Sequence, residues 1–203
     1  LIADLGCGRG GPGQRIARIT GAALVGIDIS DVALQEAHSH ARQTGMADYI
    51  SYRLASFDKT GLDDGSIDGA ISIDVIWAIP DKSEGFAEVA RILKPGGRFV
   101  FTDWERDLSP PGYPPPINDH RPLLHAAGFE IELHQYHPEA DVMRQTFYEK
   151  MLQYQGELTP VTDQRKAESV LREARAWLGL LDGVGYLKHS LRVLITARKP
   201  AAK

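Results

Sequence analysis

The sequence predicts an α/β fold in which helices cover a mostly parallel sheet. Across the first half of the 203 residues, short apolar runs alternate with segments whose apolar residues recur at helical spacing. Parallel strands joined by crossover helices produce this alternation. A glycine-rich turn follows the first apolar run, where a strand would pass into a helix. The length fits one domain with a substantial core.

Five apolar runs in the first half are interpreted as strands. They cover residues 1–5, 23–28, 49–54, 67–73 and 98–102. Between them, residues 14–19 form a short helical pattern, and Ser30 is expected to cap a second helix. Ser83 is expected to cap a third helix, which the turn residues 94–97 would end.

The second half continues with a stiff loop and further regular elements. Five of the 12 prolines fall in residues 110–116, which excludes regular helix or central strand there. After this loop, the expected elements are a helix at 121–127, a strand at 129–135, helices at 141–155 and 163–181, and a strand at 191–197.

Composition and charge restrict the class of protein. The chain is 43% hydrophobic and 25% charged, which is typical of a globular domain, and its net charge of −4 gives no general attraction to nucleic acid. No apolar run reaches the roughly 20 residues of a membrane helix. The single cysteine excludes an internal disulfide and suits a cytoplasmic protein. Because the chain begins without Met, in a run that already resembles a buried strand, we expect a preceding N-terminal segment.

The glycine-rich turn and an acidic residue point to a nucleoside ligand. Gly6, Gly8 and Gly11 fit the pattern G-x-G-x-x-G between a strand and a helix. Asp28 follows 22 residues after Gly6, at the end of the next strand, where a carboxylate can bind both hydroxyls of a ribose.

A second carboxylate favours one kind of nucleoside ligand. Asp4 comes two residues before the first glycine and would repel the pyrophosphate of a nicotinamide dinucleotide. It would attract the ammonium group of S-adenosylmethionine, which carries no phosphate. An NAD-dependent oxidoreductase would also have the glycine turn and Asp28, so it remains the alternative.

Several segments together resemble a known family. They are LIADLGCGRGG, LVGIDIS, LDDGSIDGAISIDVIWAIPD, EVARILKPGGRFVFTDW and RPLLHAAGFE, in that order. Over residues 1 to about 135, the chain resembles class I S-adenosylmethionine-dependent methyltransferases, particularly the small-molecule group with sterol, tocopherol and natural-product enzymes. The resemblance implies in-line transfer of a methyl group to a small-molecule acceptor, a metabolite or natural product.

The resemblance also implies an architecture. It is a Rossmann-like sheet, mostly parallel with a final antiparallel strand, with helices on both faces and extra helices before the last strand. We expect a single domain over residues 1–203. Within it, residues 1–135 form the cofactor-binding core, residues 136–189 a helical lid or substrate insertion, and residues 190–203 the last strand and tail.

Carried over to this chain, the family pattern assigns the methionine end of the cofactor to the glycine turn. Asp4 and the backbone of Gly6, Cys7 and Gly8 would hold it. Apart from the resemblance, Cys7 has no nearby His or Lys to activate its thiol, so we interpret it as a small packing residue.

The pattern assigns the ribose to Asp28 and the adenine to Ile29. Ser56, followed by Phe57, stands where the family usually has an acidic residue for the adenine amino group. Ser56 can accept a hydrogen bond without charge, or Asp58 could substitute for it.

Three further candidates lie at the end of the fourth strand or shortly after it. The family offers a backbone carbonyl to the methionine amino group at Ile73, and Asp74 lies beside it. Trp77 occupies the place where sterol-type relatives often have histidine. It could form a wall near the transferred methyl, because an aromatic face suits a sulfonium, or it could be a core residue.

Residues of the second half are candidates for the acceptor. Phe147 and Tyr154 belong to an apolar stripe with Met143 and Met151. This stripe could line an acceptor pocket under a lid, although the same spacing fits a helix packed on the core, which we favour.

A catalytic base is needed only if the nucleophile must lose a proton. Loops that follow strands line the crevice of such sheets, which favours Tyr113 and His120 as candidates. We expect a small-molecule acceptor as partner and neither metal, nucleic acid nor membrane, and we leave a homodimer open. A cofactor-binding protein without turnover is a further alternative.

Overall fold

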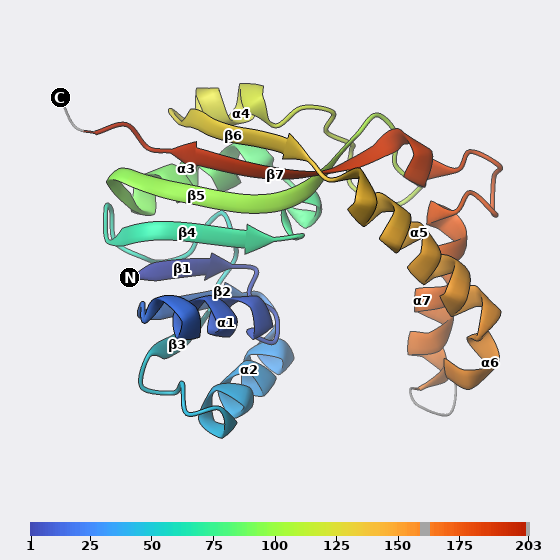
Figure 1. Cartoon of the computed structure of the whole chain (residues 1–203), viewed down its shortest axis with the longest axis horizontal. Helices are drawn as coiled ribbons and strands as arrows, with labels where there is room; N and C mark the ends of the chain where they lie inside the picture. The colour runs from blue at the N-terminus through green and yellow to red at the C-terminus, as the bar shows by residue number, and fades with distance from the viewer. Residues whose placement is uncertain (159–162, 202–203) are drawn as a thin grey trace. The chain divides into compact units, whose positions relative to one another are not determined.

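The computed structural model describes residues 1–158 and 163–201, and it contains one seven-stranded sheet in the order β3-β2-β1-β4-β5-β7-β6 (Figure 1). The strands are β1 Ile2–Leu5, β2 Leu24–Asp28, β3 Ile50–Leu54, β4 Ile67–Ile73, β5 Leu93–Arg106, β6 Glu130–Tyr136 and β7 Ser190–Arg198. β1 pairs in parallel with both β2 and β4, so the strand order reverses direction beside β1. β7 runs against its neighbours β5 and β6, which confirms the expected fold class.

Helices connect most of the strands. They are α1 Gly11–Thr20, α2 Asp31–Gln43, α3 Lys82–Ile92, α4 Arg121–Ala126, α5 Pro138–Gln153, α6 Gln155–Leu158 and α7 Gln164–Trp177, with 3-10 turns η1 Ile76–Ala78 and η2 Tyr186–His189. Every expected helix is present, whereas α6 and both 3-10 turns were not expected. Within the described residues, no helix is long and apolar enough to cross a membrane.

One of the two expected helix caps is correct. The Ser30 hydroxyl accepts a hydrogen bond from the Ala33 N–H at 3.2 Å and caps α2. The expected cap at Ser83 is wrong, because the carboxylate of Asp81 accepts the N–H groups of Ser83 and Glu84 and begins α3 two residues earlier. A carboxylate satisfies two free N–H groups at once, so it takes precedence over the nearby hydroxyl.

β5 begins earlier and ends later than residues 98–102. The chain passes directly from α3 into the strand at Leu93. Gly96 and Gly97 exchange backbone hydrogen bonds with Lys199 at 2.8 and 2.9 Å, so these turn residues are paired within the sheet. Gly96 has a φ of 81°, a value that lets the strand bend where a bulkier residue would be strained.

The chain divides into two compact units. Residues 1–103, 120–135 and the chain from Leu194 onward form the first, and residues 104–119 and 136–193 form the second. The first unit has an aromatic core. The Phe99 ring stacks on the Phe101 ring with 4.8 Å between centroids, and its centroid lies 6.1 Å from that of Phe86. All three side chains are fully buried.

The second unit is organised around tryptophan and arginine side chains. The Arg144 guanidinium lies 4.6 Å from the Trp104 ring and 5.4 Å from the Trp177 ring, so it is held between two aromatic faces. We favoured packing of the apolar α5 stripe on the core, and this expectation is wrong, because Met143 and Phe147 are exposed. Most buried apolar residues of this unit come instead from α7 and η2, and β7 adds the fully buried Val193.

Candidate functional site

The turn between β1 and α1 has the conformation that its glycines predict. Gly6 and Gly8 have φ values of 73° and 51°, in the left-handed region where other residues are strained. These glycines let the chain turn sharply while leaving the backbone free of side chains beside the ends of the parallel strands. In open α/β sheets, ligands bind at this edge, where the strand order reverses.

Asp28 organises this turn. One of its carboxylate oxygens accepts the Gly8 N–H at 2.8 Å, and the other accepts the Ser30 N–H at 2.9 Å. The carboxylate thus joins the glycine turn to the N-terminus of α2. Because each carboxylate oxygen can accept a second hydrogen bond, Asp28 keeps capacity for a ligand hydroxyl.

A cleft of about 390 Å³ opens beside this turn. It is lined by Gly6, Ile27, Asp28, Ile29, Ala55, Ser56, Phe57, Asp58, Val75, Ala78, Ile79 and Pro80. The structure therefore brings together Gly6, Asp28, Ile29, Ser56 and Phe57 from three separate segments. Ile29 is 76% exposed, so this apolar side chain is available to a ligand at the cleft.

Asp4 belongs to β1, just before the glycine turn, and does not line the cleft. Its side chain is buried, and its Oδ2 has no hydrogen-bond partner among the described residues. Burial raises the pKa of Asp4 to about 7, an effect that the nearby Asp28 charge increases and the Gly13 backbone N–H reduces. A buried carboxyl group with an unsatisfied oxygen favours a positively charged or hydrogen-donating ligand nearby.

Cys7 is a packing residue. It is buried, its Sγ lies 3.8 Å from the carbonyl oxygen of Gly8, and burial raises the pKa of its thiol well above the usual range. The protonated thiol is a poor nucleophile.

Ile73 ends β4, and Asp74 and Trp77 follow it in the segment that also contains the cleft residues Val75 and Ala78. Asp74 is the one non-glycine residue with left-handed backbone among the residues described, with a φ of 58°. The Thr102 hydroxyl donates to its carboxylate at 2.7 Å, and its carbonyl accepts the Trp77 indole N–H at 2.9 Å. Ile73, Asp74 and Trp77 do not line the cleft. Such local strain is typical of segments that shape a site.

Sequence reasoning missed the cleft wall formed by Val75, Ala78, Ile79 and Pro80. These small and apolar residues carry no chemical signal of their own. Their position directly after a parallel strand was the available sign, because that edge of the sheet borders the crevice.

His120 lies in the core and is 0% exposed. Its Nε2 is 3.0 Å from Oδ2 of Asp103, whose other oxygen accepts the Trp77 backbone N–H at 3.2 Å. The imidazole also packs 5.5 Å from the Phe101 ring. This placement gives His120 no access to the cleft, so its contacts support the wall segment through Asp103.

The remaining candidates lie in the second unit. Tyr113 lines a separate cavity and contacts the Trp177 ring edge-to-face at 5.3 Å. Phe147 and Tyr154 are 59% and 49% exposed, and neither lines that cavity.

Residues 3–101 match the family model described as a methyltransferase domain. Over these residues, about half of the chain, the protein is similar to methyltransferase domains. This match confirms the family resemblance of the segments around the glycine turn, Asp28 and the wall after β4. All residues that line the cleft described above fall within the matched residues.

Individual proteins show how far the similarity extends. A sterol 24-C-methyltransferase of Eremothecium gossypii is 34% identical over 104 residues, which cover 51% of this chain and 28% of that enzyme. The chain spans about a third of the length of the curated relatives it matches.

Two solved structures share the fold. A phosphoethanolamine N-methyltransferase of Haemonchus contortus, in complex with S-adenosylhomocysteine, aligns with a TM-score of 0.78 at 21% identity, over 98% of this chain and 48% of that one. The cyclase SpnF aligns with a TM-score of 0.78 at 25% identity, over 99% of this chain and 75% of that one. The fold of this chain is therefore shared by a methyltransferase and by a cyclase.

Proposed function

We propose that the protein is an S-adenosylmethionine-dependent methyltransferase that acts on a small-molecule acceptor. The observation that carries this proposal is the pair of carboxylates around the glycine turn. Asp28 faces the cleft with hydrogen-bonding capacity for a ribose, and Asp4 is buried behind the turn with an unsatisfied oxygen. A ligand that carries a ribose and, at its methionine end, an ammonium group suits both carboxylates.

The residues present fit this cofactor. Asp28 would hold the ribose hydroxyls, the exposed side chain of Ile29 would cover one face of the adenine, and Ser56 or Asp58 would accept from the adenine amino group. The orphaned oxygen of Asp4 would stabilise the ammonium group of the methionine end. The pyrophosphate of NAD would instead meet two carboxylates at this turn and be repelled.

When bound, the cofactor supplies a methyl group that is activated by a sulfonium. The protein has to align the acceptor with this methyl group and exclude water, and alignment alone can contribute a large part of the rate. The apolar wall of Val75, Ala78 and Ile79 lowers the polarity at the cleft. Tyr113 remains the candidate base, since the burial of His120 suits a positioning role.

Further features belong to the same proposal. Residues 1–135 would form the cofactor-binding core of a single domain, with residues 136–189 as a lid or substrate insertion that includes Phe147 and Tyr154. The exposure of these two aromatic side chains supports contact with an apolar acceptor. We further propose a cytoplasmic location, in keeping with a single cysteine, and a homodimer as the assembly to test first.

Binding and turnover need separate tests. Calorimetric titration with S-adenosylhomocysteine and with NADH should show binding of the first alone, with loss in Asp28→Ala and no change in the exposed control Asp48→Asn. Because a cyclase shares this fold, binding does not establish methyl transfer. Transfer of labelled methyl from the cofactor into a metabolite extract should therefore depend on Asp28. Binding of NADH in preference, or binding without any label transfer, would contradict the proposal.

A further inference from the structure

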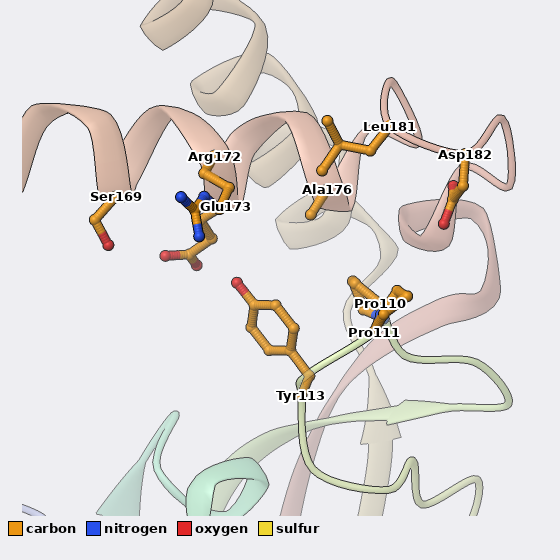
Figure 2. A pocket seen from close by; sticks show the side chains of 9 residues that line it. All are labelled: Pro110, Pro111, Tyr113, Ser169, Arg172, Glu173, Ala176, Leu181 and Asp182. Carbon is orange, nitrogen blue, oxygen red and sulfur yellow. The ribbon is translucent and has the colours of Figure 1, made fainter.

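The second unit contains a cavity of about 370 Å³ that shares no lining residue with the cleft beside the glycine turn. It lies between the proline-rich loop at Pro110–Tyr113 and α7, and Leu181 and Asp182 close one end (Figure 2). Its volume is within the range of small-molecule sites, about 300–1,000 Å³. All of its lining residues belong to this one unit.

The lining of this cavity is divided by polarity. Pro110, Pro111, Ala176 and Leu181 form a mostly apolar end. The Asp182 carboxylate also lies there, but it already accepts the Val184 N–H at 3.0 Å and the Tyr186 hydroxyl at 2.5 Å. At the other end, the hydroxyl group of Tyr113 points toward α7, where Ser169, Arg172 and Glu173 lie (Figure 2). A ligand that fits both ends has an apolar body and one polar head group.

The aromatic wall of the cavity is held firmly in place. The Tyr113 ring contacts Trp177 at 5.3 Å, and Trp177 is 4% exposed with the Arg106 guanidinium 5.2 Å from its ring. Pro110 and Pro111 restrict the backbone that carries Tyr113. Little conformational entropy would therefore be lost when a ligand packs against this wall.

Glu173 carries the strongest acceptor at the polar end. The Tyr148 hydroxyl donates to its Oε1 at 3.1 Å, and no ion pair of Glu173 or Arg172 occurs among the described residues. Burial and the Glu173 charge raise the pKa of Tyr113, so this phenol stays protonated at neutral pH. The half-buried carboxylate thus retains capacity for another donor.

The two charges at this end select the head group. An ammonium would be attracted by Glu173 and repelled by Arg172, whereas a carboxylate would meet the opposite pair of forces. A hydroxyl donates to the carboxylate and accepts from the guanidinium through one oxygen atom. We propose that this cavity binds a small neutral alcohol or phenol with an apolar body, anchored by Glu173.

Four probes of similar size test the head group. They are 4-ethylphenol, ethylbenzene, 4-ethylbenzylamine and 4-ethylbenzoate, titrated against the full chain by saturation-transfer NMR. We expect 4-ethylphenol to bind at least about tenfold more tightly than the other three, because a hydrogen bond to a charged group has this effect on affinity. Tightest binding of the amine or the benzoate, or no saturable binding of any probe, would overturn the proposal.

Variants locate the site. Glu173→Gln should weaken 4-ethylphenol about fivefold or more, while Glu168→Gln, an exposed acid on the same helix that does not line the cavity, should leave affinity unchanged. Leu181→Asp changes a side chain that is 61% exposed, so it should fold normally and weaken 4-ethylphenol at the apolar end. Equal affinity in all three variants would place the probe elsewhere. Unchanged binding of S-adenosylhomocysteine by Glu173→Gln separates this result from the cofactor test.

Discussion

Gly6 lies directly against the side chain of Val75, so that a Cβ on Gly6 would be 2.4 Å from the Val75 Cγ1 atom. The contact joins the glycine turn to the cleft wall after β4. A substitution at Gly6 is therefore strained twice, by its left-handed backbone and by this neighbour.

We expect Gly6→Ala to lower the free energy of unfolding by more than about 2 kcal/mol, since the left-handed conformation alone costs roughly 1–2 kcal/mol. Gly8→Ala is the matched control, because its φ is also positive but nothing lies within 4 Å of the added Cβ. Urea unfolding should show a smaller loss for Gly8→Ala. In a double-mutant cycle, Val75→Ala should restore part of the loss in Gly6→Ala; strict additivity would argue against the contact.

Asp28→Ala should weaken both cofactor binding and the fold. A hydrogen bond from a ribose hydroxyl to a carboxylate is worth roughly 1.5–3 kcal/mol, or about 10- to 150-fold in Kd. The variant also leaves the Gly8 and Ser30 N–H groups without their acceptor, which should cost about 1–3 kcal/mol of stability. Calorimetry and urea unfolding measure the two effects. A loss of affinity below threefold would remove Asp28 from the cofactor site.

Asp4→Asn should have opposite effects on stability and on binding. Burial raises the pKa of Asp4 from 3.8 to about 7, so the folded protein holds this proton more tightly than the unfolded chain. This carboxyl group therefore makes the cofactor-free protein less stable as the pH rises from about 4 to 7. At pH 8, Asp4→Asn should gain more than about 1 kcal/mol, because one pKa unit corresponds to about 1.4 kcal/mol.

The same variant should bind S-adenosylhomocysteine more weakly, since the ammonium group loses its charged partner. Unfolding measured from pH 4 to 8 should show a flatter profile for Asp4→Asn than for the unmodified chain. Identical profiles would show that Asp4 does not titrate in this window. If Asp4→Asn binds NADH more tightly than it binds S-adenosylhomocysteine, the oxidoreductase alternative is favoured.

His120→Gln should reduce stability without shifting the pH profile of turnover. The substitution disturbs the 3.0 Å contact with the buried Asp103, which should cost about 1–3 kcal/mol in the free energy of unfolding. A general base would behave differently, because its removal typically slows catalysis by about 10²- to 10⁴-fold and alters the pH dependence of kcat. Such a change, with cofactor affinity preserved, would return His120 to the role of base.

The predictable part of the site is the part encoded locally. Gly6 and Gly8 follow β1 directly and Asp28 is the last residue of β2, so their positions could be deduced from chain order alone. The wall at Val75–Pro80 could not, because its residues act through shape and acquire a role only when β4 is placed beside β1.

The other differences between the predicted and the observed elements have three separate physical reasons. Asp81 and Ser83 are both suitable helix caps, and Asp81 takes this role because its carboxylate accepts two N–H groups at once. The α5 stripe has a spacing that fits burial, yet Met143 and Phe147 are exposed, since periodicity does not reveal what a face will meet. β5 extends to Leu93 because Leu93 pairs with Ile67 of β4, and the backbone bonds of Gly96 and Gly97 to Lys199, about a hundred residues away, override the local turn signal.

The buried thiol of Cys7 gives the protein an intrinsic reporter. It is the single cysteine of the chain and sits inside the glycine turn, where the closed structure shields it from alkylating reagents and oxidants. The rate at which a reagent labels this thiol would then measure how often the glycine turn opens, without any introduced probe. A ligand that holds the turn closed would protect the thiol, so slow modification would signal occupancy of the cleft even when no reaction follows.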